Sequence, residues 1–187
     1  MIDEINNAVK VLESGGLILY PTDTIWGIGC DATNAKAVKR IYTLKKREDK
    51  KSMLVLIDTE TRLLQYVKDV PEIAWELIEA TDKPLTIIYP GAKNLAANLV
   101  AEDGSIGIRI PNHDFCSRLI SRFRKPIVST SANLSNEKSP QIFHDISEEI
   151  KTKVDYVVSY QQENTYRGKP SSIIKLKLNG EFSILRQ

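Results

Sequence analysis

The chain has 187 residues, enough for one domain with a substantial hydrophobic core. Its 42% hydrophobic and 27% charged residues are the proportions of an ordinary soluble globular protein. The 26 cations and 24 anions leave a net charge of +2, which excludes a strong overall field for polyanions, so nucleic-acid binding would need a local basic face. No apolar run approaches the ~20 residues that span a bilayer, so no membrane contact is expected.

Targeting and cysteine patterns favour a cytoplasmic protein. The N-terminal segment carries two acids early and no basic region before an apolar stretch, so no signal peptide is expected. Cys30 and Cys116 lie far apart without a CxxC spacing, which predicts neither a disulfide framework nor a zinc site. His113 and His144 have no partner at metal-ligand spacing, so no protein-held metal is expected.

Helical and strand patterns alternate along the first half of the chain. A continuous apolar run at 53–57 is typical of a strand buried on both faces. In chain order, the patterns predict a helix from Asp3 that ends at Gly15, a strand at 17–20, a helix at 34–44, the strand at 53–57, and helices through 63–67 and 71–78.

The second half continues with strands at 85–89, 105–110 and 127–130, a helix at 116–123, a helix from Pro140 to Ile150, and a strand at 156–159. Asn179-Gly180 lies between apolar runs at 172–178 and 181–186, which predicts a closing hairpin. These elements predict an α/β fold, a single domain over residues 1–187 with a twisted, mixed parallel and antiparallel open sheet flanked by helices. The polar loop 161–170 is the expected lid.

The segment YPTDTIWGIG is a strand followed by a turn that carries Thr22, Asp23 and Thr24, and then two glycines. Polar groups just beyond a strand's carboxyl end lie where open α/β sheets bind ligands. The same spacing is equally typical of a capped turn whose glycines serve only backbone geometry. The segment is neither GxGxxG nor a Walker loop, so no standard nucleotide-binding loop is present.

Three cations, Lys45, Arg47 and Lys51, follow the helix that is expected to end near Leu44. A charge run at a helix C-terminus is commonly a solvated end, where cations suit the helix dipole. The buried strand predicted directly after this run holds it near the sheet, which favours binding of phosphate or carboxylate. Both interpretations stay open at this point.

The segment PIVSTSAN is an apolar strand that ends in hydroxyl and amide side chains. The hydroxyl and amide groups of Ser129, Thr130, Ser131 and Asn133 suit binding of phosphate, carboxylate or ribose. The lack of a GxSxG elbow argues against a serine hydrolase. Arg109 lies inside a strand, where a lone arginine is either a surface residue or an anion ligand of the same pocket. Ser172 and Arg186, on the two arms of the hairpin, either join that pocket or merely end strands.

Taken in order, these segments resemble the YrdC/Sua5 family of threonylcarbamoyl-AMP synthases, in its short bacterial form. The resemblance covers nearly the whole chain and rests on YPTDTIWGIGCDA, LKKREDKKSMLVLI, PLTIIYPG, SIGIRIP, STSANLSNEKSP and the closing SSIIKL and ILRQ. Any one segment is a weak match, but the ordered set is highly specific. The resemblance implies a YrdC-like domain with a concave basic pocket.

The resemblance also implies roles for individual residues. The family's catalytic Lys-Arg-Ser-Asn tetrad falls on Lys45, Arg47, Ser131 and Asn133. Positions that bind ATP or its product fall on Arg47, Lys51, Ser105, Ser131, Ser139 and Arg186. Positions at the threonine end of the pocket fall on Thr22, Arg109, Ser129 and Ser172.

The reaction that the resemblance implies joins L-threonine, bicarbonate and ATP into threonylcarbamoyl-adenylate and releases pyrophosphate, with Mg²⁺ travelling with the nucleotide. A partner transferase complex then moves the threonylcarbamoyl group to N6 of adenosine 37 in ANN-decoding tRNAs. Both bond-forming steps bring anions together. The pocket's main work is therefore neutralisation and positioning, with no protein nucleophile.

Two other functions compete with this one. A non-catalytic module that binds tRNA or double-stranded RNA would use the family's concave basic surface, but the near-neutral charge and the lack of an aromatic stacking set argue against it. A YciO-like protein would bind a nucleotide without making the adenylate. That group departs at the tetrad, so intact Lys45, Arg47, Ser131 and Asn133 favour the synthase.

Overall fold

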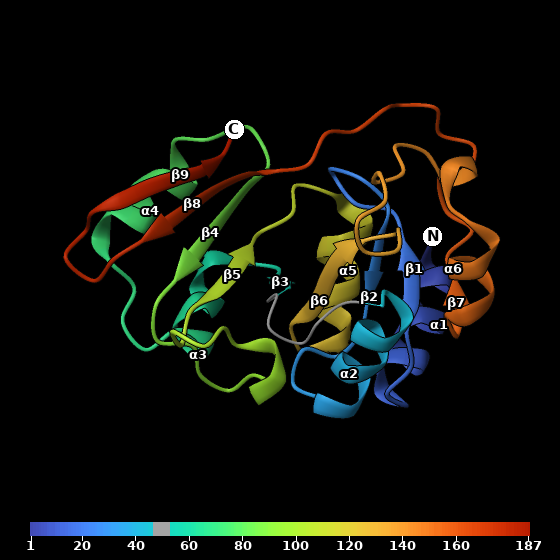
Figure 1. The fold of residues 1–187 in the computed structure, drawn as a ribbon, viewed down its shortest axis with the longest axis horizontal. Helices are drawn as coiled ribbons and strands as arrows, with labels where there is room; N and C mark the ends of the chain where they lie inside the picture. The colour runs from blue at the N-terminus through green and yellow to red at the C-terminus, as the bar shows by residue number, and fades with distance from the viewer. Residues whose placement is uncertain (47–52) are drawn as a thin grey trace.

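A single mixed sheet runs across the molecule (Figure 1). The computed structural model describes residues 1–46 and 53–187, and within these residues the strand order is β7-β1-β2-β6-β3-β5-β4-β8-β9. The strands are β1 (Ile18–Tyr20), β2 (Gly27–Gly29), β3 (Leu54–Leu56), β4 (Leu85–Tyr89), β5 (Ile106–Arg109), β6 (Ile127–Ser131), β7 (Tyr156–Val157), β8 (Ser172–Leu176) and β9 (Phe182–Arg186). The pairs β1–β7, β3–β5 and β4–β8 run parallel and the other neighbours run antiparallel, which confirms the expected mixed open sheet.

Helices flank the sheet. They are α1 (Ile2–Glu13), α2 (Ala35–Leu44), α3 (Leu63–Tyr66), α4 (Glu72–Glu79), α5 (Asp114–Phe123) and α6 (Glu148–Lys153), with short 3₁₀ turns at Glu60–Arg62, Ala97–Leu99 and Phe143–Asp145. The start of α2 is fixed by Asn34, whose Oδ1 accepts from the N–H groups of Lys36 and Ala37 at 3.0 and 3.2 Å. None of the helices in the described ranges is long and apolar enough to cross a bilayer.

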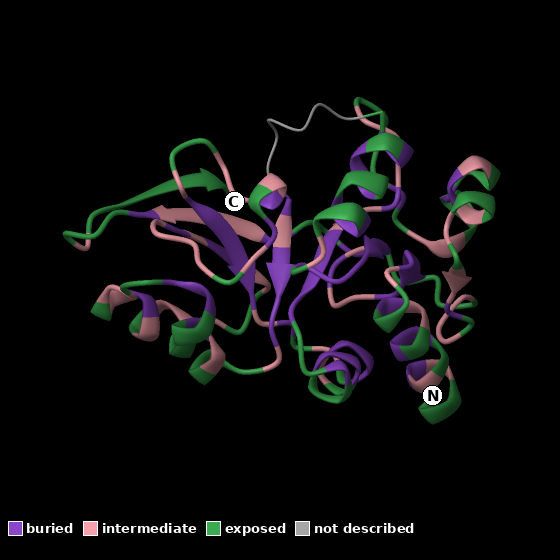
Figure 2. Ribbon diagram, turned by 90° about the horizontal axis from the view of Figure 1, so that it is seen from below, coloured by how far each residue is buried: buried purple, intermediate pink, exposed green. Residues whose placement is uncertain are grey.

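Strand residues alternate between two hydrophobic clusters. Ile18 and Tyr20 pack with the apolar faces of α1 and α5, whereas Leu17 and Leu19 belong to the larger cluster with α2. This division follows from the period of two along a strand. Figure 2 shows the buried residues gathered in the central strands, while β9, at one end of the sheet, is exposed.

Two segments differ from the sequence-based prediction. β2 was expected to be part of a turn, because its glycines are typical of turns. A side chain at Gly29 would lie 2.7 Å from the ring of Tyr20 and 2.8 Å from the carbonyl of Val128, so glycine lets this strand fit between its neighbours. The helix expected from residue 140 begins only at Glu148, because Phe143 turns inward against Trp26 with ring centroids 4.8 Å apart.

Candidate active site

A cleft of about 260 Å³ opens where β2, β3, β4, β5, β6 and β8 come together. Successive side chains of a strand point to opposite faces of the sheet. Gly107 and Arg109 of β5 therefore line the cleft, while Ile108 between them lies in the core. Of the predicted site residues, the cleft brings together Arg109, Ser129, Ser131, Ser139 and Arg186. It also contains the hydroxyl groups of Thr24 and Thr130, which belong to the two polar segments identified from the sequence, and those of Thr86 and Ser171, which the sequence did not single out.

The other predicted residues lie elsewhere. The hydroxyl of Thr22 is bonded within its own turn and borders a separate pocket of about 40 Å³. Ser105 lies at the far end of β5 from Arg109, where its N–H and Oγ bind Oδ1 of Asp103 at 3.0 and 2.6 Å. Hydrogen bonds from Lys175 and Ser105 lower the pKa of Asp103 to about 2.

Two of the predicted cations, Arg47 and Lys51, lie outside the described residues. Ser172 pairs with Leu85 in the sheet and does not line the cleft, whereas its neighbour Ser171 does. A step of one residue along a strand moves a side chain to the opposite face, so the local pattern identified the strand but not the face.

Lys45 is nearly fully buried, with 1% of its surface exposed, directly after α2. Its Nζ donates to the backbone carbonyls of Ser131 and Asn133, each at 2.5 Å, and its own carbonyl accepts from the N–H of Ser135 at 2.9 Å. The solvated helix end considered for the basic run is therefore wrong for Lys45. These charge-assisted bonds fix the course of the chain after β6, where Ser131 enters the cleft.

Asn133 closes the same loop. Its Nδ2 donates to the carbonyls of Leu134 and Glu137 at 2.8 and 2.9 Å. Its Oδ1 is buried and has no hydrogen-bond partner within the described ranges. A buried acceptor left unpaired costs about 1–3 kcal/mol. Asn133 is not among the residues that line the cleft, so its visible contribution is to the loop that follows β6.

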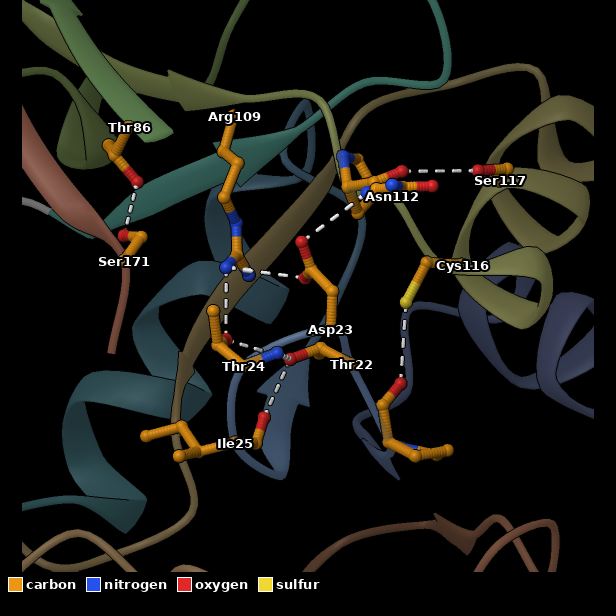
Figure 3. A network of polar contacts seen from close by, with 12 residues as sticks. Thr22, Asp23, Thr24, Ile25, Thr86, Arg109, Asn112, Cys116, Ser117 and Ser171 are labelled. Atoms are coloured by element: carbon orange, nitrogen blue, oxygen red, sulfur yellow. Dashed lines mark hydrogen bonds and ion pairs between the residues drawn. The ribbon is translucent and has the colours of Figure 1, made fainter. Parts of the chain in front are cut away.

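Arg109 is not a surface residue, because only 3% of it is exposed. Its Nη1 lies 3.3 Å from Oδ1 of Asp23 and donates to Oγ1 of Thr24 at 2.9 Å (Figure 3). The other oxygen of Asp23 accepts from the N–H of Asn112 at 3.3 Å. The turn after β1 therefore contributes to the site, because it contacts Arg109. It is more than the capped turn that the sequence also allowed.

Arg186 brings a second guanidinium to the cleft from β9. Its Nε donates to the carbonyl of Ser171 at 2.8 Å, and its Nη2 donates to Oγ of that residue at 3.4 Å. Burial and the nearby charge of Arg109 lower the pKa of Arg186. Two like charges facing one cleft form an arrangement that an anionic ligand stabilises.

The segment 159–171 crosses from β7 to β8 (Figure 1). Its Gly168 lies directly against the turn after β1, because a Cβ there would overlap the carbonyl oxygen of Thr24. Arg167 donates to Gln141 at 2.8 Å, and Gln161 contacts His113 at 3.1 Å. The predicted lid thus makes contacts at several points along its length.

Gly168→Ala is expected to lower the free energy of unfolding by about 1–3 kcal/mol, because the added methyl overlaps backbone atoms that must move. Urea denaturation measures the effect. Lys169→Ala, at the exposed neighbouring position, serves as the control and is expected to match the wild type. Equal stability of both variants would contradict the close approach of Gly168 to Thr24.

The site's chemistry suits anions better than a bare cation. Within residues 1–46 and 53–187, no group of three or more His, Cys, Asp or Glu side chains is placed to hold a metal ion. The carboxylate of Asp23 is engaged by Arg109. Guanidinium groups and hydroxyls around the cleft match phosphate and carboxylate oxygens instead.

Known sequences are similar to this chain over most of its length. The Sua5_yciO_yrdC family model, described as "Telomere recombination", matches residues 10–187. The "Threonylcarbamoyl-AMP synthase" of Pseudoalteromonas translucida (strain TAC 125) is 32% identical over 93% of both chains. The "Putative threonylcarbamoyl-AMP synthase" of Methanocaldococcus jannaschii is 34% identical over 94% of this chain and 81% of the relative.

Solved structures share the fold. The crystal structure of P. abyssi Sua5 complexed with L-threonine has a TM-score of 0.82 at 27% identity, over 92% of this chain. This chain covers 50% of that one, so it spans about half the length of P. abyssi Sua5. E. coli YciO has a TM-score of 0.84 at 25% identity, over 98% of this chain and 88% of YciO. From the family model matched over residues 10–187 and the shared fold, the chain belongs to the Sua5/YciO/YrdC family.

Proposed function

We propose that this protein is an L-threonylcarbamoyladenylate synthase, a nucleotidyltransferase that acts as a single domain over residues 1–187. The main support is the cleft, in which Arg109 and Arg186 stand among serine and threonine hydroxyls. The naming of relatives as threonylcarbamoyl-AMP synthases, over 93% of both chains in one case, supports the same function. A related protein, P. abyssi Sua5, has been crystallised with L-threonine.

Arg109 and Ser129 form the amino-acid end of the proposed site. Both side chains line the cleft and both residues are buried, at 3% and 5% exposure. A buried guanidinium matches a carboxylate in geometry and charge, and a hydroxyl adds a neutral hydrogen bond. We assign these two residues to the carboxylate and amine end of L-threonine.

Ser131, Ser139 and Arg186 form the nucleotide end. They lie around the same cleft on β6, on the following loop and on β9. Arg47 and Lys51, which lie outside the described residues, are proposed to add charge for the phosphates. Lys45 and Asn133 hold the loop after β6, so that Ser131 faces the nucleotide.

In the proposed reaction, the amine of L-threonine attacks bicarbonate, and loss of water leaves a carbamate. A carbamate oxygen then attacks the α-phosphorus of ATP, and the bond to the leaving pyrophosphate breaks. The reactants are anions at both steps. The chain's contribution is therefore to hold them together and to offset their charge with guanidinium and hydroxyl groups.

Mg²⁺ is proposed to arrive with ATP, bound to phosphate oxygens. The product is proposed to pass to a transferase complex that modifies adenosine 37 of ANN-decoding tRNAs, and we place the enzyme in the cytoplasm with these substrates.

The direct test measures pyrophosphate released by the purified protein from ATP, Mg²⁺ and bicarbonate, with and without L-threonine. Release is expected to require threonine and to fall about 10- to 100-fold in Ser131→Ala, which removes one hydrogen bond to the reacting groups. Ser121→Ala, on the exposed face of α5, is the matched control and is expected to retain full activity. Absence of threonine-dependent release from a folded protein that binds ATP would overturn the proposal and favour a YciO-like nucleotide-binding protein.

A further inference from the structure

We propose that Asp23 and Thr24 are positioning residues that orient the guanidinium of Arg109, so that its Nε–Nη2 edge holds the carboxylate of the amino-acid substrate. The inference rests on the proposed function for the identity of that substrate. The orientation itself follows from the contacts of Arg109 with Asp23 and Thr24.

The donors of Arg109 divide into two sets. A guanidinium has five N–H groups, two of them on Nη1. Nη1 donates to Oγ1 of Thr24 at 2.9 Å and forms an ion pair with Oδ1 of Asp23 at 3.3 Å, so both of its contacts lie in the turn after β1. Nε is buried and has no partner within the described ranges. The side chain lines the cleft, so the Nε–Nη2 edge is the one suited to bind a carboxylate through two parallel hydrogen bonds.

The hydrogen bonds in the turn after β1 all donate in one direction. Oγ1 of Thr22 donates its single proton to the carbonyl of Ile25 at 2.7 Å, so it must accept in its 2.9 Å contact with Oγ1 of Thr24. Thr24 is therefore the donor in that pair, and its lone pairs accept from Arg109. The chain of bonds runs from Arg109 through Thr24 and Thr22 to a backbone carbonyl (Figure 3).

This direction also gives Thr22 a role. Its hydroxyl donates once and accepts twice, from the hydroxyl of Thr24 and from the N–H of Thr24 at 3.1 Å. A threonine hydroxyl has one proton and two lone pairs, so no capacity remains for a substrate. The hydroxyl of Thr22, at the position that the resemblance places in contact with threonine, is therefore assigned to the support of Thr24.

Asp23 supplies the charge that the buried guanidinium needs. Its side chain is 7% exposed, and its position is fixed by the N–H of Asn112. Arg186 brings a second positive charge to the same cleft. Without Asp23, two guanidinium groups would repel each other across the cleft, and Arg109 would lose the contact that holds Nη1 away from the substrate.

The test compares Thr24→Val, which keeps the shape without the hydroxyl, with Thr24→Ser, which keeps the hydroxyl. Thr24→Val and Asp23→Asn are expected to raise KM for L-threonine about 10-fold or more and to change KM for ATP less than about 2-fold, because only the carboxylate clamp is disturbed. Thr24→Ser is expected to restore KM to near the wild-type value. Equal effects on both KM values, or no effect, would overturn the proposal.

Asp31→Asn is the matched control for loss of a buried carboxylate. Asp31 is 4% exposed and pairs with Lys125 at 2.7 Å, away from the cleft residues. This variant is expected to lower the unfolding temperature and to leave both KM values unchanged. An increase in KM for L-threonine in Asp31→Asn would mean that buried-charge loss alone explains the Asp23 result, which would overturn the positioning role.

A second measurement needs no substrate. The guanidinium nitrogens of Arg109, assigned by their loss in Arg109→Lys, are followed by ¹⁵N NMR. Wild type is expected to give separate Nη signals from restricted rotation, and Thr24→Val and Asp23→Asn to average them. Unchanged signals in both variants would overturn the proposal. Wild-type protein that shows this restriction but no threonine-dependent pyrophosphate release would contradict the proposed function and leave the orientation of Arg109 supported.

Two roles are open to Thr22: contact with the substrate, or support of Thr24. Comparing two substrates that differ in their side chain separates these roles. Thr22→Val is expected to weaken use of L-threonine and L-serine by the same factor. A changed ratio between the two amino acids would show that Thr22 contacts the substrate.

Discussion

Lys45→Met is expected to reduce threonine-dependent pyrophosphate release at least about 100-fold and to lower the free energy of unfolding by about 1–3 kcal/mol. Methionine replaces the four-atom apolar stem of lysine but has no ammonium group to donate a hydrogen bond. The carbonyls of Ser131 and Asn133 would then lose the donor that Lys45 supplies at 2.5 Å, at a site where the lysine is only 1% exposed. The loop that carries Ser131 into the cleft would lose its anchor.

Urea denaturation and the pyrophosphate assay on the same preparation measure both effects. Lys46→Met is the matched control, because the side chain of Lys46 is 67% exposed and its ion pair with Glu149 is 3.4 Å long. Exposed ion pairs contribute little, so this neighbour is expected to behave as the wild type. A Lys45→Met protein with wild-type stability and activity would contradict the anchoring role.

Arg109→Lys is expected to lower kcat/KM for L-threonine about 100-fold while the protein stays folded. Lysine keeps the charge that Asp23 pairs with, so no buried carboxylate is left alone. It lacks the planar fork, however, and cannot hold a carboxylate through two parallel bonds. Steady-state kinetics at saturating ATP isolates this loss.

Arg118→Lys is the control, because it tests whether replacing an ion-paired arginine by lysine impairs the protein in general. Arg118 pairs with Asp114 on the outer side of α5, with 58% of its side chain exposed, and is expected to accept the change. If Arg109→Lys retained the wild-type KM for L-threonine, the guanidinium of Arg109 would not be the carboxylate ligand.

The sequence predicted the mixed α/β sheet because period-two and helical patterns are local properties of the chain. β2 was missed because its glycines are also typical of turns, and what selects a strand there is the close approach of Tyr20 and Val128. The helix predicted from residue 140 began late for a similar reason, since the contact of Phe143 with Trp26 is a tertiary one.

The sequence predicted which types of residue form the candidate site better than it predicted which of them are in contact. The hydroxyl-rich end of β6 and the arginine in β5 stood out by position in their strands. Lys45 and the carbonyl of Ser131, however, meet across 86 positions of the chain, and Arg109 meets Thr24 across 85. Such pairs depend on strand order, which no local pattern specifies. The choice between Ser171 and Ser172 depended on register in the same way.

We propose that this cleft joins threonine, bicarbonate and the adenylate of ATP in one molecule. Mass spectrometry can identify the products formed from ATP, L-threonine and ¹³C-bicarbonate. A threonylcarbamoyl-AMP ion that carries the ¹³C label is expected, and it is expected to be lost when threonine is omitted. Consumption of ATP without any labelled adenylate that contains threonine would contradict this proposal.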